Sequence, residues 1–396
     1  MGMALGLYIS VPFCRTKCTY CNFASDVFSR PMFRGYVERV CADIHSTAQT
    51  AQRLGGRVEQ DVDSVYLGGG TPTILDCQQL ERLFVTVRQN FRLLPETELT
   101  VECAPGTLTQ PMLETLVKCG VNRVSLGVQS FVDQEAASVG RLHKRTTVVE
   151  DIARLRAAGI ANINIDLIAG LPHQTAGSWQ TSLDDTIASE ARHVSVYMLE
   201  VDEDSRLGRE LIAGGTKYHA HFVPHEELIT ELYVHACEQM EAAGVKQYEI
   251  SNFACPGFES RHNLKYWTRQ PYLGFGVDAH SMLLGSDQGV EAIRLSTSDS
   301  LDQFVAGTPL HRTDISHQAA LEETFFLGLR LTQGIDLEKV RAKFGTFVVT
   351  ALGPTIVELA TAGLINWEGD RIRLTARGRL LSNEAFERFL IDRVAQ

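Results

Sequence analysis

The sequence predicts an α/β fold, a partial (β/α)6 TIM-like barrel followed by a small C-terminal α+β domain. Short β-rich runs recur through the first half of the chain, segments with apolar residues at helical spacing separate them, and the pattern changes after about residue 300. Strands that alternate with helices of this length form βα units and a parallel sheet. The six β-rich runs are residues 7–11, 64–67, 98–102, 123–127, 163–167 and 194–199.

The loops that follow these runs are chemically unusual. They read GGGTP after the second run, CAPGT around the third, VQSF after the fourth and AGLPHQT after the fifth. In barrels of this architecture the functional site lies at the carboxyl ends of the strands. We therefore expect the site at this edge of the sheet.

The rest of the chain predicts a long helix and then a separate small domain. Two helices, a hairpin around Glu-Gly-Asp and a closing helix predict a winged-helix-like arrangement. We expect a core domain over residues 1–290, which carries the site, and a C-terminal domain over residues 300–396. The predicted helices are residues 226–243, 319–331, 355–362 and 376–389, and the hairpin strands are residues 364–367 and 371–374.

The composition is that of an ordinary globular protein. Its 396 residues are 44% hydrophobic and 21% charged, and no run of about 18 uninterrupted apolar residues occurs. The N-terminus lacks the pattern of a secretion signal, so we expect a cytoplasmic protein, with transient membrane association left open. The net charge of −11 argues against nucleic acid as a partner.

Three of the nine cysteines crowd into eight residues directly after the first predicted strand. Cys14, Cys18 and Cys21 have the spacing Cys-x3-Cys-x2-Cys, which suits metal ligation better than a disulfide framework in a reducing compartment. Three thiolates on one short loop can hold one [4Fe-4S] cluster and leave its fourth iron open to an outside ligand. A zinc site with its fourth ligand elsewhere in the chain is the alternative.

This cysteine motif, with Tyr20 ahead of its last thiol, resembles that of the radical SAM superfamily, and the resemblance covers nearly the whole chain. It implies that the open iron binds S-adenosylmethionine (SAM), which an electron from the cluster can cleave to a radical. Gly68, Gly69, Gly70 and Thr71 fit the glycine motif of the superfamily, whose backbone can approach SAM closely. A plain turn at a strand end is the alternative.

Five further residues match the SAM contacts of the subfamily that acts on porphyrins. Carboxylates at these positions can accept from an ammonium group or from ribose hydroxyls, and a guanidinium can pair with a carboxylate. For each position, the alternative is a polar group that is satisfied within the fold. The five residues are Tyr8, Glu102, Gln129, Arg141 and Asp166.

Two groups within the superfamily remain open. Oxygen-independent coproporphyrinogen III dehydrogenases carry a further cysteine two residues after the third and a longer N-terminal segment, whereas this chain has Phe23 there and thirteen residues before Cys14. Residues 261–267, RHNLKYW, instead resemble the HNxxYW motif of the HemW group of heme chaperones. That resemblance implies heme as cargo and an acceptor hemoprotein as partner, with an electron donor such as a ferredoxin or flavodoxin. A radical SAM enzyme with an unrelated substrate is a third hypothesis.

The HNxxYW motif supplies the candidate heme contacts. His262 can be an axial ligand of heme iron, and Tyr266 and Trp267 can pack on the macrocycle. Alternatively, His262 bonds within the barrel mouth and Trp267 belongs to the core, and His280 is a second candidate ligand. Ser10 stands where both groups usually carry histidine, and serine cannot replace imidazole as a proton carrier near neutral pH. This departure weakens the dehydrogenase hypothesis most.

Overall fold

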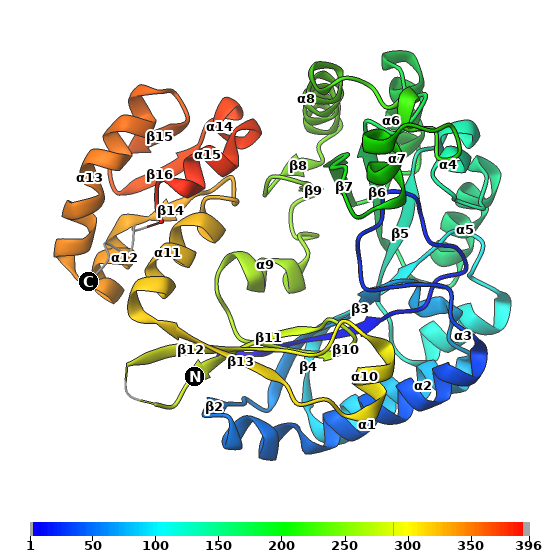
Figure 1. Ribbon diagram of the computed structural model, residues 1–396, viewed down its shortest axis with the longest axis horizontal. Helices are drawn as coiled ribbons and strands as arrows, with labels where there is room; N and C mark the ends of the chain where they lie inside the picture. Colours follow the sequence, from blue (N-terminus) through cyan, green and yellow to red (C-terminus); the bar gives the residue numbers. More distant parts are fainter. Residues whose placement is uncertain (1–2, 288, 391–396) are drawn as a thin grey trace.

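The computed structural model describes residues 3–287 and 289–390 and shows an open barrel beside a small second domain (Figure 1). Six strands pair in parallel in the order in which they occur along the chain. The predicted α/β fold and its six β-rich runs are confirmed. The strands are β1 (Leu5–Val11), β3 (Asp61–Gly69), β4 (Arg92–Cys103), β5 (Arg123–Gln129), β6 (Asn162–Ala169) and β7 (His193–Met198).

Residues of these strands alternate between the two faces of the sheet, as the pleat of a β-strand requires. In β1, Leu7, Ile9 and Val11 are fully buried in the main hydrophobic core. Tyr8 and Ser10 lie on the opposite, inner face of the same strand. The inner face therefore carries the polar groups, and it is the face on which a site can form.

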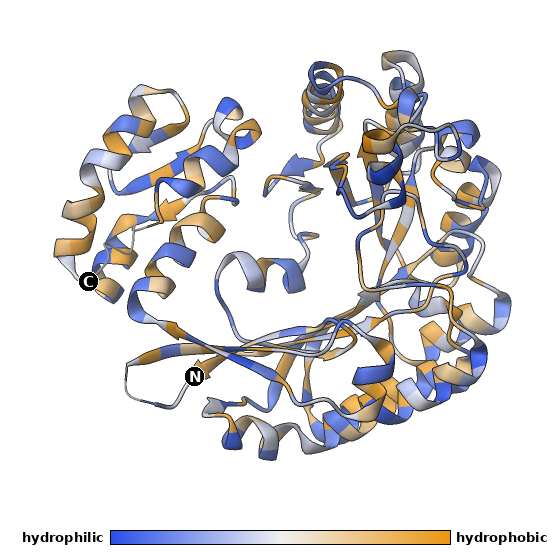
Figure 2. Ribbon diagram, viewed as in Figure 1, coloured by the Kyte–Doolittle hydropathy of each residue, from blue (hydrophilic) through white to orange (hydrophobic). Residues whose placement is uncertain are grey.

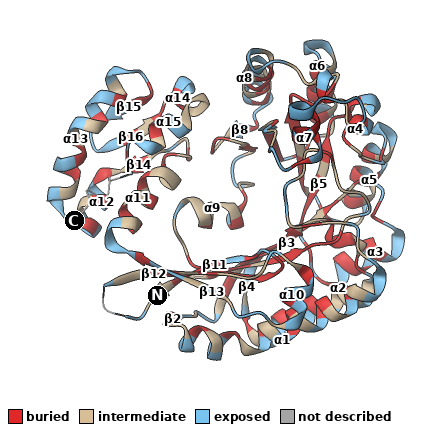
Figure 3. Ribbon diagram, viewed as in Figure 1, coloured by how far each residue is buried: buried red, intermediate tan, exposed pale blue. Residues whose placement is uncertain are grey.

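Helices cover the outer face of the parallel strands (Figures 1 and 3). Asp76 caps α2 (Cys77–Asn90) and Thr175 caps α6 (Ala176–Ala188), and each accepts a hydrogen bond from a free backbone amide of the first turn. Within the described ranges, every helix is too short or too polar to span a lipid bilayer. The other helices of this domain include α1 (Arg30–Arg53), α3 (Gln110–Lys118), α4 (Asp133–Ser138), α5 (Arg145–Ala157), α7 (Arg206–Ala213) and α8 (Glu226–Ala242).

The sheet extends beyond the six predicted strands at both edges. On the far side of β1, β10 (Tyr272–Gly276) pairs in parallel and leads into three antiparallel strands. On the far side of β7, β9 (Asn252–Ala254) pairs in an antiparallel direction. The pairings of the described residues do not join the two edges, so the barrel is open. The remaining strands are β2 (Gly56–Arg57), β8 (Lys246–Gln247), β11 (His280–Gly285), β12 (Val290–Ser296) and β13 (His311–Ser316).

The C-terminal domain packs helices against a three-stranded sheet around its own core, which includes Phe325, Leu337, Ile356 and Ile372. Figure 2 shows apolar positions on both its helices and its hairpin. The predicted hairpin is present within one residue at each strand. The elements are α11 (His317–Gly328), β14 (Ile335–Asp336), α12 (Leu337–Phe344), α13 (Thr346–Thr361), β15 (Ile365–Glu368), β16 (Arg371–Leu374), α14 (Ala376–Leu380) and α15 (Ser382–Glu387).

Three details of this domain differ from the prediction. Helix α12 was not expected, and α13 begins nine residues before the predicted start because Pro354 lies inside the helix rather than at its beginning. The expected closing helix over residues 376–389 is two short helices, separated at Leu381. The proposed domain limits stay a prediction, and residues 1–2 and 391–396 of those domains lie outside the described residues.

Candidate functional site

Cys14, Cys18 and Cys21 lie on the loop between β1 and α1, and all three are half-buried. The base of the loop is closed by two backbone hydrogen bonds. The amide of Cys14 donates to the carbonyl of Asp26 at 2.9 Å, and the amide of Asp26 donates to the carbonyl of Pro12 at 2.9 Å. The end of β1 therefore sets the position of the first thiol.

The middle of this cysteine loop is held by segments far away in the sequence. The Thr19 amide donates to the carbonyl of Val139 at 3.2 Å, and the Thr19 carbonyl accepts from the amide of Leu207 at 2.8 Å. The Thr16 hydroxyl donates to the carbonyl of Gly140 at 3.0 Å. The thiols are thus carried by a loop that packs against the end of α4 and the start of α7.

Burial raises the pKa values of the Cys14 and Cys21 thiols, and the neighbouring Cys18 raises both further. The three sulfurs are therefore close enough to influence one another electrostatically. No three His, Cys, Asp or Glu side chains among residues 3–287 and 289–390 are gathered closely enough to hold a metal ion. The loop brings the thiols near each other without arranging them around one centre.

The glycine motif at the end of β3 lies directly against the start of the cysteine loop. The amide of Gly70 donates to the carbonyl of Val11 at 2.7 Å, and the amide of Thr71 donates to the carbonyl of Phe13 at 2.7 Å. A β-carbon on Gly70 would lie 2.6 Å from the Phe13 carbonyl oxygen and 3.0 Å from the Cys14 sulfur. Glycine is needed here because any side chain would fill the space beside that sulfur. Three thiols with such a space fit an iron-sulfur cluster by their chemistry.

Glu102 and Tyr66 form a pair on the inner face, beside the first glycine of the motif. The Tyr66 hydroxyl donates to the Glu102 carboxylate at 2.9 Å, and a β-carbon on Gly68 would lie 2.8 Å from the same oxygen. Burial, followed by the charge of Asp166, raises the pKa of Glu102 to about 7. The carboxyl group can therefore take up a proton near neutral pH, and a cationic ligand would favour its ionised form.

Gln129 and Arg141 meet at the end of β5. Gln129 is buried and has a left-handed backbone conformation, with φ of +68°. A β-carbon on Gly127 would lie 3.2 Å from both the Gln129 amide nitrogen and an Arg141 guanidinium nitrogen. Arg141 donates to the Tyr20 hydroxyl of the cysteine loop at 3.2 Å, while its buried Nε has no partner among the described residues. The guanidinium thus links the strand end to the cysteine loop and keeps one donor free.

Asp166 lies on the inner face of β6, three residues before the end of the strand. Its two carboxylate oxygens accept hydrogen bonds from the Ser125 hydroxyl at 3.0 Å and from the Asn164 amide at 2.7 Å. Burial raises the pKa of Asp166. Gly127 is its neighbour in the strand register, so Asp166 lies in the row of inner-facing residues beside the Gln129 and Arg141 pair.

Tyr8 and Ser10 complete the inner face on β1. Tyr8 pairs in register with Tyr66, and their ring centroids lie 6.0 Å apart. Ser10 pairs in register with Gly68 and with Gly276 of β10, and its carbonyl accepts from the Tyr36 hydroxyl at 2.7 Å. Ser10 therefore lies between two glycines, near the carboxyl end of the strand.

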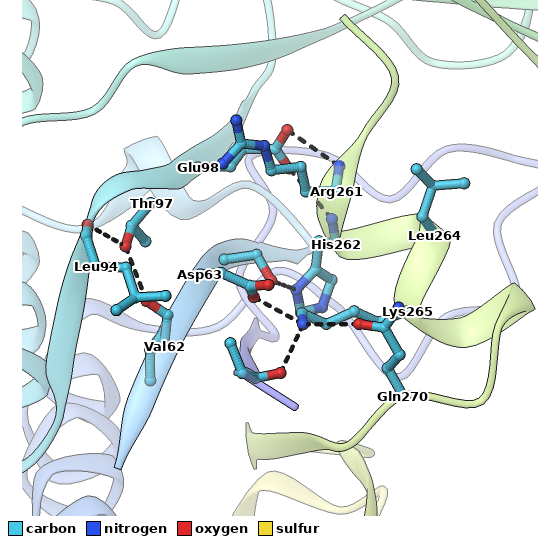
Figure 4. Close-up of polar contacts among 12 residues, drawn as sticks. Val62, Asp63, Leu94, Thr97, Glu98, Arg261, His262, Leu264, Lys265 and Gln270 are labelled. Atoms are coloured by element: carbon cyan, nitrogen blue, oxygen red, sulfur yellow. Dashed lines mark hydrogen bonds and ion pairs between the residues drawn. The ribbon is translucent and has the colours of Figure 1, made fainter. Parts of the chain in front are cut away.

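The HNxxYW segment forms the short helix α9 (Arg261–Trp267), which lies against the inner face of β1 and β3 (Figures 1 and 4). The Glu98 carboxylate accepts from the backbone amides of Arg261 at 3.2 Å and His262 at 3.3 Å, which satisfies two free amides of the first turn. The Lys265 side chain is 2% exposed, and its Nζ atom lies 2.7 Å from Oδ1 of Asp63. These contacts fix the helix against the sheet.

His262 is 1% exposed, and both of its ring nitrogens have partners. Nδ1 lies 3.1 Å from the Ser64 hydroxyl and Nε2 lies 2.8 Å from the Tyr266 hydroxyl. Burial, followed by the charge of Lys265, lowers the pKa of His262 to about 3, so the ring is neutral. Heme ligation by His262 stays a prediction, and it would require at least one of these two hydrogen bonds to break.

The other candidate heme contacts lie in different surroundings. The Arg330 guanidinium, two residues after the end of α11, lies 4.4 Å from the centre of the Trp267 ring. One face of that indole is therefore already in contact with a cation. His280 begins β11 and is 60% exposed at its side chain, with Nε2 3.8 Å from the Asp278 carboxylate. The structure therefore does not bring His280, His262 and Trp267 together at one surface.

Arg123 is a buried charged residue on the inner face of the sheet that the sequence interpretation did not identify. It begins β5, is 1% exposed, and its Nε and Nη1 atoms have no hydrogen-bond partner among the described residues. Burial lowers the pKa of Arg123, but the charge of Glu98 and the neighbouring Tyr66 raise it above its ordinary value. A charged residue in the apolar run RVSLGV was the available signal, because a buried arginine needs acidic or polar neighbours on the same face.

Comparisons with known proteins match both parts of the chain. Residues 8–186 match the Radical SAM superfamily, and residues 315–381 match the HemN C-terminal domain. The heme chaperone HemW of Lactococcus lactis is 32% identical, over 97% of this chain and 97% of its own length. The chain belongs to the HemW family of radical SAM proteins. Membership of the radical SAM superfamily implies a [4Fe-4S] cluster and SAM as cofactors.

Further members of the HemW family match over a similar length. The heme chaperone HemW of Bacillus subtilis is 34% identical over 97% of this chain and 98% of its own length, and that of Escherichia coli is 28% identical over 98% of each. A structure titled coproporphyrinogen III oxidase (HemN) from Escherichia coli covers 98% of this chain at a TM-score of 0.82 and 23% identity, with 90% of its own chain covered. At this identity the likeness to HemN shows a shared fold.

Proposed function

We propose that this protein binds heme and passes it to an acceptor hemoprotein. The observation that carries the proposal is the match to relatives named heme chaperones, at 32% and 34% identity, over 97% of the chain. The match includes both domains, so it does not rest on the cofactor-binding barrel alone. The fold shared with HemN gives no comparable support for coproporphyrinogen chemistry, because a fold can carry many functions.

Cys14, Cys18 and Cys21 would hold the [4Fe-4S] cluster, and the polar inner face beside them would hold SAM. When bound, the cluster supplies an electron and an open iron position. The supporting observations are the space that Gly70 leaves beside the Cys14 sulfur and the hydrogen bond between Arg141 and Tyr20 of the cysteine loop. The residues proposed to bind SAM are Tyr8, Gly68, Gly69, Gly70, Thr71, Glu102, Gln129, Arg141 and Asp166.

Roles within the SAM site follow from charge and position. Glu102 and Asp166 are carboxylates on the inner face, and both suit the ammonium group or ribose hydroxyls of SAM. Arg141 keeps its Nε free and suits the SAM carboxylate. A ferredoxin or flavodoxin as electron donor, a cytoplasmic location and transient membrane contact stay predictions.

Heme transfer and porphyrin chemistry are separated by one experiment. The full chain is reconstituted without oxygen, with iron, sulfide and SAM, and is then titrated with hemin or incubated with coproporphyrinogen III. We expect stoichiometric heme uptake, release of that heme to an apo-hemoprotein, and no consumption of coproporphyrinogen. Absence of heme binding would contradict the proposal, and steady consumption of coproporphyrinogen would favour the dehydrogenase instead.

A further inference from the structure

Histidines outside the HNxxYW motif gather near the carboxyl ends of the barrel strands. His173 lies in the loop after β6, and His219 and His221 flank the start of the 3-10 helix η2 (Ala220–Phe222), which precedes α8. Nε2 of His173 lies 3.3 Å from Nδ1 of His219, and the two ring centroids are 5.2 Å apart. The loop after β6 and the segment before α8 thus form one imidazole pair from residues 46 positions apart.

Backbone geometry shows that this pair is imposed by the fold. His173 has φ of +71° and His219 has φ of +63°, a left-handed conformation that costs free energy for residues other than glycine. Two backbone hydrogen bonds maintain it: the His173 amide donates to the carbonyl of Phe222 at 3.0 Å, and the Phe222 amide donates to the carbonyl of His219 at 2.9 Å. Strain of this kind is commonly found at binding and catalytic sites.

An exposed aromatic ring lies beside the pair. Phe222 is 46% exposed, with its ring centroid 4.0 Å from that of His173 and 4.1 Å from that of His221. An exposed aromatic ring flanked by imidazoles can stack on a flat apolar partner. Ring and imidazoles together therefore suit a macrocycle that carries a metal.

The same segment is joined to the cysteine loop. Ala220 belongs to a small hydrophobic cluster with Leu171 and Leu207, against which Tyr20 of the cysteine loop packs. Asn22 of that loop donates to the carboxylate of Asp202 at 3.1 Å. A ligand on the histidine pair would therefore lie on the side of the barrel that carries the thiols.

The hydrogen bond between the two rings assigns them different roles. A histidine that ligates a metal through one ring nitrogen usually donates its other N–H to a neighbouring acceptor. In His219, Nδ1 is engaged by His173, whereas Nε2 has no hydrogen bond to another described residue. A neutral imidazole has one acceptor nitrogen, so His173 can accept from the Nδ1–H of His219 through Nε2.

We propose that His219 ligates the iron of heme through Nε2, with His173 as the positioning residue that accepts from Nδ1–H and Phe222 as the apolar contact of the macrocycle. The proposal rests on the proposed function and names its cargo site. Heme iron already has four porphyrin nitrogens and needs one axial ligand, whereas a bare metal ion would need three or more protein donors, which do not converge among the described residues.

Hemin titration of the reconstituted full chain, followed by absorption and electron paramagnetic resonance, tests this site. Asparagine and glycine tolerate the left-handed conformation, so variants at these positions keep the backbone. We expect His219→Asn to lose the spectrum of imidazole-ligated heme and to bind hemin about tenfold or more weakly. His173→Gly should shift the spectrum and weaken binding, and His173→Asn should restore part of both, because its carbonyl can accept from Nδ1–H.

Control measurements distinguish a wrong assignment of His219 from a failure of the proposed heme-binding function. His311→Ala removes an exposed histidine on β13 and should leave hemin binding unchanged. SAM binding should be the same in all variants. Lack of hemin binding by the unmodified protein would contradict the proposed function itself. Retention of the imidazole-ligated spectrum in His219→Asn, with normal affinity, would overturn only the assignment of His219.

Discussion

The Nε2 nitrogen of His262 lies 2.8 Å from the hydroxyl oxygen of Tyr266, one helical turn later in α9. Its Nδ1 nitrogen lies 3.1 Å from Ser64 of β3, so the imidazole joins the helix to the sheet. A buried ring that satisfies two hydroxyl groups stabilises the fold, because loss of the ring leaves both hydroxyls without a partner. The histidine and tyrosine of the HNxxYW motif thus have a structural role in this conformation.

The first prediction concerns this role. His262→Ala should lower the free energy of unfolding by about 2–4 kcal/mol, because it opens a cavity and leaves buried hydroxyls unpaired. Chemical denaturation of the full chain measures the change. His280→Ala is the matched control, since among the described residues that exposed ring has only a long contact, to Asp278. Unchanged stability in His262→Ala, combined with loss of hemin binding, would assign His262 to the heme instead.

The cysteine loop provides the second prediction. Cys14→Ala, Cys18→Ala and Cys21→Ala should each abolish the brown chromophore and weaken SAM binding, because a cluster with three protein ligands does not tolerate the loss of one. Iron and sulfide analysis after anaerobic reconstitution checks this. Cys77→Ala removes a half-buried thiol at the start of α2 and should leave the cluster intact. Full cluster content in any of the three variants would refute the assignment, and so would an unmodified protein that contains zinc and no inorganic sulfide.

The space beside the Cys14 sulfur leads to the third prediction. Gly70→Ala places a β-carbon 2.6 Å from a backbone oxygen and 3.0 Å from the sulfur, so the start of the cysteine loop must move. We expect a folded protein that retains less iron and sulfide than the unmodified chain. Gly353→Ala in α13 is the control, since its β-carbon meets no atom within 4 Å and alanine favours the helix. Equal cluster content in both variants would mean that the glycine motif does not shape the cluster site.

The fourth prediction uses the pKa of Glu102, which burial and Asp166 raise from 4.5 to about 7. The fold favours the protonated carboxyl, so its contribution to stability is complete below about pH 4.5 and is lost as the pH rises through about 7. Glutamine is an uncharged mimic of the protonated carboxyl group. Without SAM, the free energy of unfolding of Glu102→Gln should therefore rise by roughly 1–3 kcal/mol relative to that of the unmodified protein as the pH goes from 5 to about 8. Thermal or denaturant unfolding across this range gives the difference.

A matched variant controls for general effects of pH. Glu59→Gln removes an exposed carboxylate and should show no such trend. Addition of SAM should reduce the difference at Glu102, since a cation nearby lowers the pKa of the carboxyl group. A Glu102→Gln curve parallel to that of the unmodified chain would show that the carboxyl titrates in its ordinary range.

Local pattern was enough to predict the strands of the barrel. The alternation of Leu7, Tyr8, Ile9 and Ser10 in β1 already separates the core face from the inner face, because the side-chain period of a strand is two. The closing helix of the C-terminal domain was predicted less well. The helix breaks at Leu381, three residues after Gly378, and glycine is a weak helix former that the prediction of one continuous helix passed over.

By itself, the sequence determined the α/β barrel, the position of the thiols after the first strand, and membership of the radical SAM superfamily, because all three depend on short motifs and local periodicity. Only the tertiary structure decided which partners the histidine rings contact. His262 meets Ser64 across 198 positions, and His173 meets His219 across 46. Such pairs form only when strands and loops far apart in the chain are brought together, and no local pattern specifies them.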